Sequence, residues 1–314
     1  MTDCVLGLDG GGTKTGALVL DLGGIPLGEA AAGPCNIAAV PVADALAAVR
    51  VAVEAALAVS GKRREDVRAV CAGIAGFSHA ERRRRFRAGL QEEFPDALIS
   101  VEPDYTVALT GATDGTPGIV VIAGTGSVAY GENAAGEAHR AGAYGYLIDD
   151  AGSGYGVGRA ALAAVLRAAD GTGEGTALTG RLCAALGLVS VADIIPAVYG
   201  GRLDRAAIAA LAPAVTDAAR EDEDAVARAL LMRAGGALAR LAEAVAARLF
   251  PDAAAAYPVA PIGSLWNAGL PLVDVFTRSL ARFAPAAVLS PPRRPPAHGA
   301  ALRALNALAE ARQS

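Results

Sequence analysis

The 314-residue chain is poor in the residue types that several common kinds of site require. Its four cysteines include no Cys-x-x-Cys pair, so neither a structural zinc site nor a redox motif is indicated. Its three histidines are dispersed, which argues against a histidine metal cluster. No run reaches the roughly 18 apolar residues of a spanning helix, and the first residues carry no leader pattern. We therefore expect a cytoplasmic protein without membrane contact, whose cysteines act as small apolar residues.

Charge and aromatic side chains are also scarce. Charged residues make up 19% of the chain, aromatics 4%, and the net charge is −4. A protein that neutralises many phosphates needs a strongly basic surface, so we expect no nucleic-acid partner. The run from Arg82 to Arg85 is flanked by Glu81, Glu92 and Glu93, and we interpret it as a solvated helix face. The hydrophobic content of 53% is enough for two domain cores.

One three-strand pattern occurs twice. An apolar run at residues 5–8 leads into Gly10-Gly11-Gly12, and an apolar pattern resumes at residues 15–20. About 112 residues later the run 119–123 leads into Gly124-Thr125-Gly126. Two unrelated Gly-rich hairpins are the alternative, but the repeat favours a duplicated α/β domain.

The remaining segments alternate between helical and strand patterns. After the first opening we expect helices at 43–60 and 79–94 and strands at 67–72 and 97–101. The second half is helical from Gly158 to about Arg248 and then has strands at 259–262 and 287–289. The predicted domains are residues 1–112, completed by a helix within 298–314, and residues 113–297, which carry a helical insertion.

The first Gly-rich turn has the composition of a phosphate site. Asp9 ends a buried strand, three glycines follow, and Thr13, Lys14 and Thr15 add hydroxyls and a cation. Glycine amides can converge on phosphate oxygens because no Cβ blocks the ligand. The Walker pattern is absent, and the glycines join two strands instead of opening a helix. A turn that merely needs glycine is the alternative.

Two further features strengthen the phosphate interpretation. Gly124-Thr125-Gly126-Ser127 again combines glycine amides with hydroxyls after a buried strand, so we expect two facing turns that clamp a phosphate chain. Asp104 follows the strand at 97–101, and strand ends are where catalytic groups of α/β sheets lie. Alternatively, Asp104 caps the helix that begins with Tyr105 and Thr106.

Taken in order, the motifs resemble a known family. They are Asp9-Gly-Gly-Gly-Thr13, Gly33-Pro-Cys-Asn36, Ala72-Gly-Ile-Ala-Gly76, Asp104, Ala123-Gly-Thr-Gly-Ser127, Gly145 to Ser153, and Ile262-Gly-Ser-Leu-Trp266. This set is similar to the N-acetylglucosamine kinases of the BadF-type (BadF/BadG/BcrA/BcrD) ATPase family, within the actin-like sugar-kinase superfamily. The resemblance covers about residues 5–305. It implies an α/β fold of two duplicated actin-like (ribonuclease H-like) ATPase domains flanking a cleft.

The resemblance also implies a role for each site residue. Asp104 is the catalytic residue that accepts the proton of the sugar hydroxyl, and Asp9 holds Mg²⁺ largely through water. The ATP-binding residues are Gly11, Gly12, Thr13, Lys14, Gly124, Thr125, Gly126, Gly263 and Ser264. The sugar-binding residues are Asn36, Asp104, Ser127, Gly145, Tyr146 and Asp150.

The expected activity is ATP-dependent phosphorylation of an amino sugar, N-acetylglucosamine at O6 or a relative such as glucosamine or N-acetylmuramic acid. The cofactors are ATP and Mg²⁺, and we expect a homodimer. Tyr144-Gly145-Tyr146 and the turn at 149–153 depart from the family pattern, which leaves the sugar open. One alternative is an activator ATPase of the 2-hydroxyacyl-CoA dehydratase type, but Cys71 and Cys183 are too isolated to bridge an iron–sulfur cluster. A non-catalytic sugar- or nucleotide-binding regulator is another.

Overall fold

The computed structural model describes residues 3–251 and 255–313 and divides into two compact units. The first unit is residues 1–117 with 291–314, and the second is residues 118–290. Within the described residues each unit holds a five-stranded sheet, in the orders β3-β2-β1-β4-β5 and β8-β7-β6-β9-β10. In both, the first three strands of the unit are antiparallel and the last two run parallel to the first. The matching strand orders confirm the predicted repeat.

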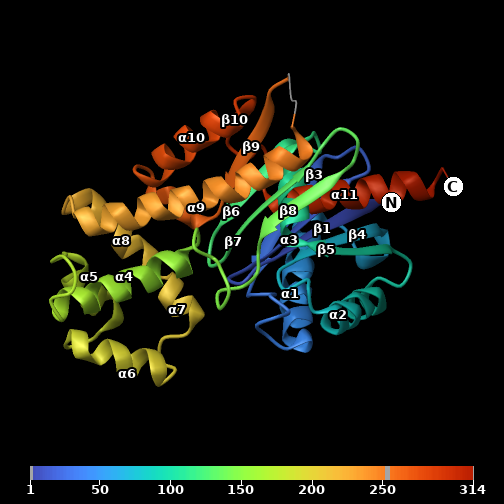
Figure 1. The fold of residues 1–314 in the computed structure, drawn as a ribbon. Coiled ribbons are helices and arrows are strands. Elements are labelled where there is room, and N and C mark those ends of the chain that lie inside the picture. The colour runs from blue at the N-terminus through green and yellow to red at the C-terminus, as the bar shows by residue number, and fades with distance from the viewer. Residues whose placement is uncertain (1–2, 252–254, 314) are drawn as a thin grey trace. The chain divides into compact units, whose positions relative to one another are not determined.

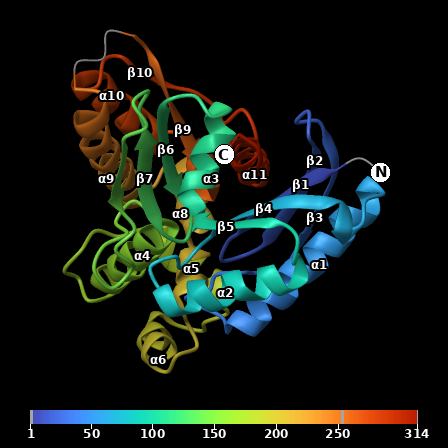
Figure 2. The same ribbon diagram turned by 90° about the vertical axis from the view of Figure 1, so that its right-hand side faces the viewer.

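The first unit packs helices on both faces of its sheet (Figures 1 and 2). Its strands are β1 (Cys4–Gly10), β2 (Thr15–Asp21), β3 (Pro26–Ala32), β4 (Val67–Ile74) and β5 (Leu98–Pro103). Its helices are α1 (Val42–Ser60), α2 (Ala80–Glu93), α3 (Asp104–Thr113) and α11 (Pro296–Ala311), with a short 3-10 helix at Arg64–Asp66. Alternate residues of β1 serve opposite faces: Leu6 and Leu8 join the core under α1 and α2, and Val5 joins that under α11.

Helix α11 lies directly on the central strands of the first unit. Its approach to β1 depends on Gly7, where an added Cβ would come within 2.2 Å of the Ala297 oxygen and the Ala301 nitrogen. Its own Gly299 leaves room for α3, because a Cβ there would lie 2.1 Å from the Val107 oxygen. Segments far apart in sequence therefore form one core, in which α11 packs on both β1 and α3.

The second unit combines its sheet with a helical insertion. Its strands are β6 (Gly118–Ala123), β7 (Ser127–Glu132), β8 (Ala138–Gly142), β9 (Tyr257–Ile262) and β10 (Ala287–Leu289). Its helices are α4 (Gly154–Ala169), α5 (Leu178–Leu186), α6 (Ile194–Tyr199), α7 (Arg205–Ala209), α8 (Ala212–Glu221), α9 (Ala225–Leu249) and α10 (Leu272–Phe283), with 3-10 helices at Val191–Asp193 and Ser264–Ala268.

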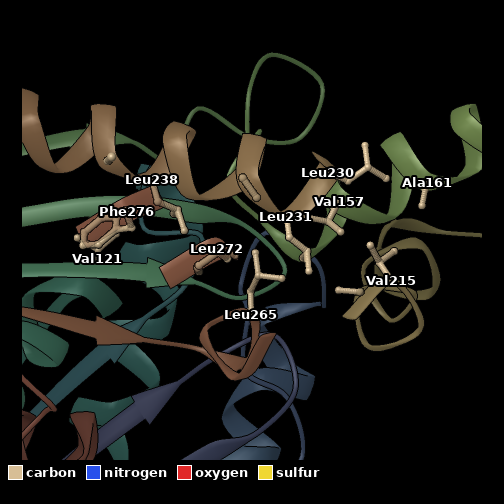
Figure 3. Close-up of a cluster of buried hydrophobic side chains, with 14 of the residues drawn as sticks. Val121, Val157, Ala161, Val215, Leu230, Leu231, Leu238, Leu265, Leu272 and Phe276 are labelled. Atoms are coloured by element: carbon tan, nitrogen blue, oxygen red, sulfur yellow. The ribbon is translucent and has the colours of Figure 1, made fainter. Parts of the chain in front are cut away.

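The core of the second unit runs from the sheet into the insertion (Figure 3). Helix α9 carries the apolar face that joins them: Leu238 packs in the same cluster as Val121 of β6, and Leu230 in the same cluster as Val157 of α4. Capping starts both helices, since the Asp224 side chain accepts from the Ala227 amide and the Ser153 hydroxyl accepts from the Gly156 amide. The turn before α4 is thereby held against the end of the sheet.

In the part of the chain that the structure describes, no single helix has the length and apolar character of a membrane span; the helices Leu178–Leu186 and Val191–Tyr199 meet that test only as a pair bent by 56°.

Candidate functional site

Two carboxylates gather at one end of the first sheet. Strands β1, β4 and β5 are parallel neighbours, and their register places Asp9 beside Gly73 and Gly73 beside Glu102. Asp104 follows two residues after Glu102, so Asp9 and Asp104 share the end of the sheet where parallel strands present their carboxyl ends. The sequence predicted both residues, and the structure brings them together.

Both carboxylates resist ionisation. Burial and, to a smaller extent, the negative charge of Asp104 raise the pKa of Asp9 to about 6, although Lys14 partly opposes the rise. Burial likewise raises the pKa of Asp104, against the amide of Tyr105, which donates to Asp104 Oδ1 at 2.9 Å. Pro103 occupies the N-cap position of α3 and makes no side-chain capping bond, and Asp104 is the first helical residue. Asp104 is therefore not the N-cap residue, although its Oδ1 satisfies one free amide of the first turn.

The turn between β1 and β2 is open toward solvent. Gly12, Thr13 and Lys14 are exposed, and a Cβ at Gly12 would meet nothing within 4 Å. The amide of Gly11 donates to the Lys14 oxygen at 3.0 Å, so it closes the turn and is not available to a phosphate. The Thr15 hydroxyl, expected to be a phosphate donor, instead donates to the Gly33 oxygen at 2.6 Å. The residues left to contact phosphates here are Gly12, Thr13 and Lys14.

The Asn36 loop is tied to this turn. The Cys35 amide donates to the Gly11 oxygen at 3.0 Å, and Asn36 Oδ1 accepts from the Ala38 amide at 2.9 Å. This bond fixes the side chain and leaves its NH₂ group without a partner among the described residues. Gly76, with φ of +81°, packs so close that a Cβ would lie 2.8 Å from Asn36 Oδ1. Asn36 therefore presents two fixed donors.

The arginine run lies on a largely exposed helix face, as expected, and two of its members also bind backbone oxygens. Arg82 donates to the Ile37 oxygen at 2.6 Å, next to Asn36, and Arg83 donates to the Phe77 oxygen at 3.1 Å. Arg84 pairs with Glu81 in the expected way. The first two arginines hold the carbonyls of the loops around Asn36, which helical periodicity alone does not reveal.

In the second unit, the turn at 124–126 lies beside Gly263. Strand β9 is the parallel neighbour of β6, with Ile122 opposite Ile262. Gly263 has φ of +108°, and a Cβ there would come within 2.4 Å of the Ala123 oxygen. The backbone following each strand thus lies side by side, which brings Gly124, Thr125 and Gly126 to Gly263 and Ser264. A Cβ at Gly124 would meet nothing within 4 Å, so this turn is also open. The Gly124 amide donates to the Gly126 oxygen at 3.0 Å, so, like that of Gly11, it is not available to a phosphate.

Asp150 is buried against the same turn. Its side chain is 2% exposed, its φ is +77°, and its Oδ1 accepts from the Ser127 amide at 2.9 Å. Burial raises its pKa, while the Ser127 amide and the charge of Arg205 oppose the rise. Gly145 and Tyr146 begin the loop that ends at Asp150, and Gly145 has φ of +89° with open space around it.

Sequence reasoning missed one member of this group. Arg205 Nη2 donates to Asp150 Oδ2 at 3.2 Å, and its guanidinium carbon lies 5.2 Å from the Tyr146 ring centre. Arg205 stands 55 residues after Asp150, in the helical insertion, and no motif surrounds it. Only the fold of the insertion brings it to the sheet.

The described residues fit a hydrated magnesium ion better than a protein-made metal cage. Within residues 3–251 and 255–313, no three histidine, cysteine or acidic side chains gather as a metal site. Mg²⁺ usually keeps several waters and takes one or two carboxylates together with substrate phosphates. Asp9, with Asp104 nearby, offers that kind of site. Burial raises the pKa of Cys4 to about 11 and that of Cys35 to about 12, so these thiols are neutral and unsuited to a metal.

Comparison with known proteins identifies the family of this chain. The model of the BadF/BadG/BcrA/BcrD ATPase family matches residues 6–304, and the chain belongs to that family. It is 34% identical to an N-acetylmuramic acid/N-acetylglucosamine kinase of Clostridium acetobutylicum over 68% of this chain and 70% of that protein. It is 28% identical to an N-acetyl-D-glucosamine kinase of Dictyostelium discoideum over 96% and 97%.

The solved structures agree with the fold. A proposed N-acetylglucosamine kinase of Chromobacterium violaceum superposes with a TM-score of 0.76 at 30% identity, covering 96% of this chain and 98% of that one. The α/β fold with two duplicated domains, expected from the sequence, is confirmed, and each domain holds a five-stranded sheet.

Proposed function

We propose that this protein is an ATP-dependent kinase that phosphorylates an amino sugar, with N-acetylglucosamine at O6 as the preferred acceptor. The observation that carries the proposal is the pair Asp9 and Asp104 at one sheet end, both with a raised pKa. The relatives named above act on N-acetylglucosamine and N-acetylmuramic acid, which supports the substrate class. A soluble cytoplasmic homodimer is part of the same proposal.

Asp104 is the proposed general base. Phosphoryl transfer to a hydroxyl requires that the hydroxyl lose its proton, and a positioned carboxylate accepts it. A carboxylate with a raised pKa holds a proton more strongly than an ordinary one, which favours the transfer. The Tyr105 amide holds Oδ1, and this leaves Oδ2 to take the proton. Asp104 must start ionised, so the rate falls as the pH drops through its raised pKa.

Asp9 is the proposed partner of the metal. When bound, Mg²⁺ would neutralise charge on the phosphates of ATP. The negative charge of Asp104 is one cause of the raised pKa of Asp9, and a cation at Asp9 would relieve that repulsion. Because a proton and Mg²⁺ compete for the same carboxylate, Asp9 binds the ion more weakly below about pH 6.

The two turns and the Asn36 and Asp150 loops bind the reactants in this proposal. Thr13, Lys14 and the Gly12 backbone in one unit, and Thr125 with Gly126 in the other, bind phosphate oxygens. Gly263 and Ser264 lie along the nucleoside. Asn36 donates to the sugar through its free NH₂ group. Asp150 accepts from sugar hydroxyls, and the Ser127 hydroxyl donates to them.

The proposal is tested by a kinase assay over a panel of acceptors. Purified protein with ATP and Mg²⁺ is offered N-acetylglucosamine, glucosamine, N-acetylmannosamine and N-acetylmuramic acid, and ADP release is compared with sugar phosphate formed. The phosphorylated position follows from ³¹P–¹H correlation spectra of the product. We expect coupled ADP and sugar 6-phosphate with N-acetylglucosamine. ADP release that no sugar stimulates would refute a sugar kinase and favour an ATPase.

A further inference from the structure

Arg205 joins three parts of the second unit: the loop with Tyr146 and Asp150, the turn at Gly126, and the helical insertion. It is the first residue of α7 and donates from Nη2 to Asp150 Oδ2 at 3.2 Å. Its guanidinium also lies over Tyr146, with 5.2 Å from the guanidinium carbon to the ring centre. A Cβ added at Gly126 would be only 2.9 Å from Arg205 Nη2. The side chain therefore spans the loop, the turn and the helical insertion.

Asp150 depends on this contact for its ionisation and its orientation. One oxygen is held by the Ser127 amide and the other by Arg205, so the carboxylate plane is fixed. The charged groups that act on it are Arg205 from α7 and Asp149 from its own loop, and Asp149 opposes ionisation. Burial also opposes it, which leaves the Ser127 amide and Arg205 to keep the charge in place.

The position of Arg205 leaves one of its own hydrogen-bond donors unsatisfied. Its Nε is buried and has no hydrogen-bond partner among the described residues. A buried donor without a partner is unfavourable. An unrestrained arginine side chain would turn its Nε–H group to solvent or to an acceptor. The Arg205 side chain is held in this position by Asp150 on one side and by the Tyr146 ring on the other.

We infer that Arg205 is a positioning residue of the sugar site, which acts through Asp150 and Tyr146. It keeps the Asp150 carboxylate charged and in a fixed orientation. The carboxylate can then accept hydrogen bonds from neighbouring hydroxyls of an uncharged sugar. It also supports the Tyr146 ring, which Tyr155 of α4 meets edge-on with ring centres 5.0 Å apart. This inference rests on the proposed function and adds a residue outside every motif of the sequence.

A purely structural role of Arg205 predicts a different outcome when the residue is replaced. If Arg205 only tethers α7 to the sheet, its loss lowers stability without selecting between the two substrates. If it positions Asp150, its loss weakens the sugar far more than ATP. The effect also grows at low pH, because Asp150 without its cation is protonated more readily.

The test compares Arg205→Gln and Arg205→Lys with Arg202→Gln. Arg202 lies three residues earlier and donates to the Leu186 oxygen at 2.7 Å, so it reports on loosening of the same segment away from Asp150. The kcat and both KM values are measured with N-acetylglucosamine and MgATP at about pH 7.5 and about pH 6, and thermal unfolding is followed in parallel.

For Arg205→Gln we expect the KM for sugar to rise about 10-fold or more, with the KM for ATP within about 2-fold of wild type. The rise should be larger at the lower pH. Arg205→Lys should recover part of the sugar affinity, and Arg202→Gln should match wild type in both KM values. An unchanged sugar KM in Arg205→Gln, or an equal rise in both KM values, would overturn the inference.

Failure of the proposed function gives a different result. If the wild-type protein phosphorylates no sugar of the panel, the amino-sugar kinase assignment fails, and the role of Arg205 fails with it. If the wild type phosphorylates the sugar and Arg205→Gln keeps its sugar KM at both pH values, the inference alone fails.

Discussion

In the first unit the strand before the Gly-rich turn ends Leu8-Asp9-Gly10, whereas in the second it ends Val121-Ile122-Ala123. The register pairs Gly10 with Thr15 and Ala123 with Ser127, so Asp9 and Ile122 occupy equivalent places one residue before the end. The same hairpin therefore carries a carboxylate in one unit and an apolar side chain in the other. The second unit takes its carboxylate, Asp150, from a loop that follows β8.

This difference indicates that the two copies of the duplicated fold have different chemical roles. The strand and helix pattern keeps both turns open, as the free space at Gly12 and Gly124 shows. The carboxylates that favour a metal and a proton transfer are at the sheet end of the first unit. In the second unit the buried carboxylate binds an amide and an arginine instead. In the proposed kinase, acid–base chemistry belongs to one copy and recognition to both.

The largest expected effect comes from Asp104, the carboxylate of the first unit that is proposed as the general base. Asp104→Asn keeps the shape and one acceptor but cannot take a proton, so kcat should fall about 10²- to 10⁴-fold. Both substrates should still bind, as isothermal titration with each would show. A matched control is Glu102→Gln, which breaks the 2.6 Å pair with Arg303 and should affect stability more than kcat. A nearly normal kcat in Asp104→Asn would remove Asp104 as the base.

An intermediate effect is expected where the two turns are alike. Gly12→Ala and Gly124→Ala place a methyl group in open space, so neither should change the melting temperature much. Because phosphate would meet that methyl group, each variant should raise the KM for ATP about 10-fold, with a smaller effect on the sugar. Gly175→Ala, which is also open, is the matched control. If only one turn responds, the two copies do not share the phosphate chain.

The smallest expected effect is on stability. The pKa of Asp9 is about 6 in the folded protein against 3.8 ordinarily, so the folded state binds the extra proton between about pH 4 and pH 6. Wild-type stability from this group therefore falls as the pH rises through that window. Asp9→Asn should remove this dependence and stabilise the protein by about 1 kcal/mol at neutral pH.

Thermal unfolding at about pH 4.5 and about pH 7.5 checks this expectation, with the exposed Asp96→Asn as control. A variant that is less stable than wild type at neutral pH would mean that Asp9 has a structural role. In that case the contrast with Ile122 would reflect packing and not function.

Much of the fold was predictable because apolar periodicity sets the strands and turns. The runs at residues 5–8 and 119–123 fall inside β1 and β6, and Asp9 and Asp104 stood out because each follows such a run. Thr15 was misjudged, since its partner is a backbone oxygen 18 residues away that no local pattern reveals. Arg82 and Arg205 were missed for the same reason: a helical pattern gives the spacing of side chains but not the oxygens that they reach across the fold.

The return of the chain in α11 has a consequence for synthesis. Residues 118–290 form a continuous segment, so the second unit can fold as soon as it leaves the ribosome. The first unit is interrupted: β1 is made before residues 118–290, but the helix that packs on Gly7 through Ala297 and Ala301 is made after them. Until then the face of β1 that bears Val5 lacks the part of its cover that α11 provides, and this buried surface of the finished protein is exposed to chaperones and proteases.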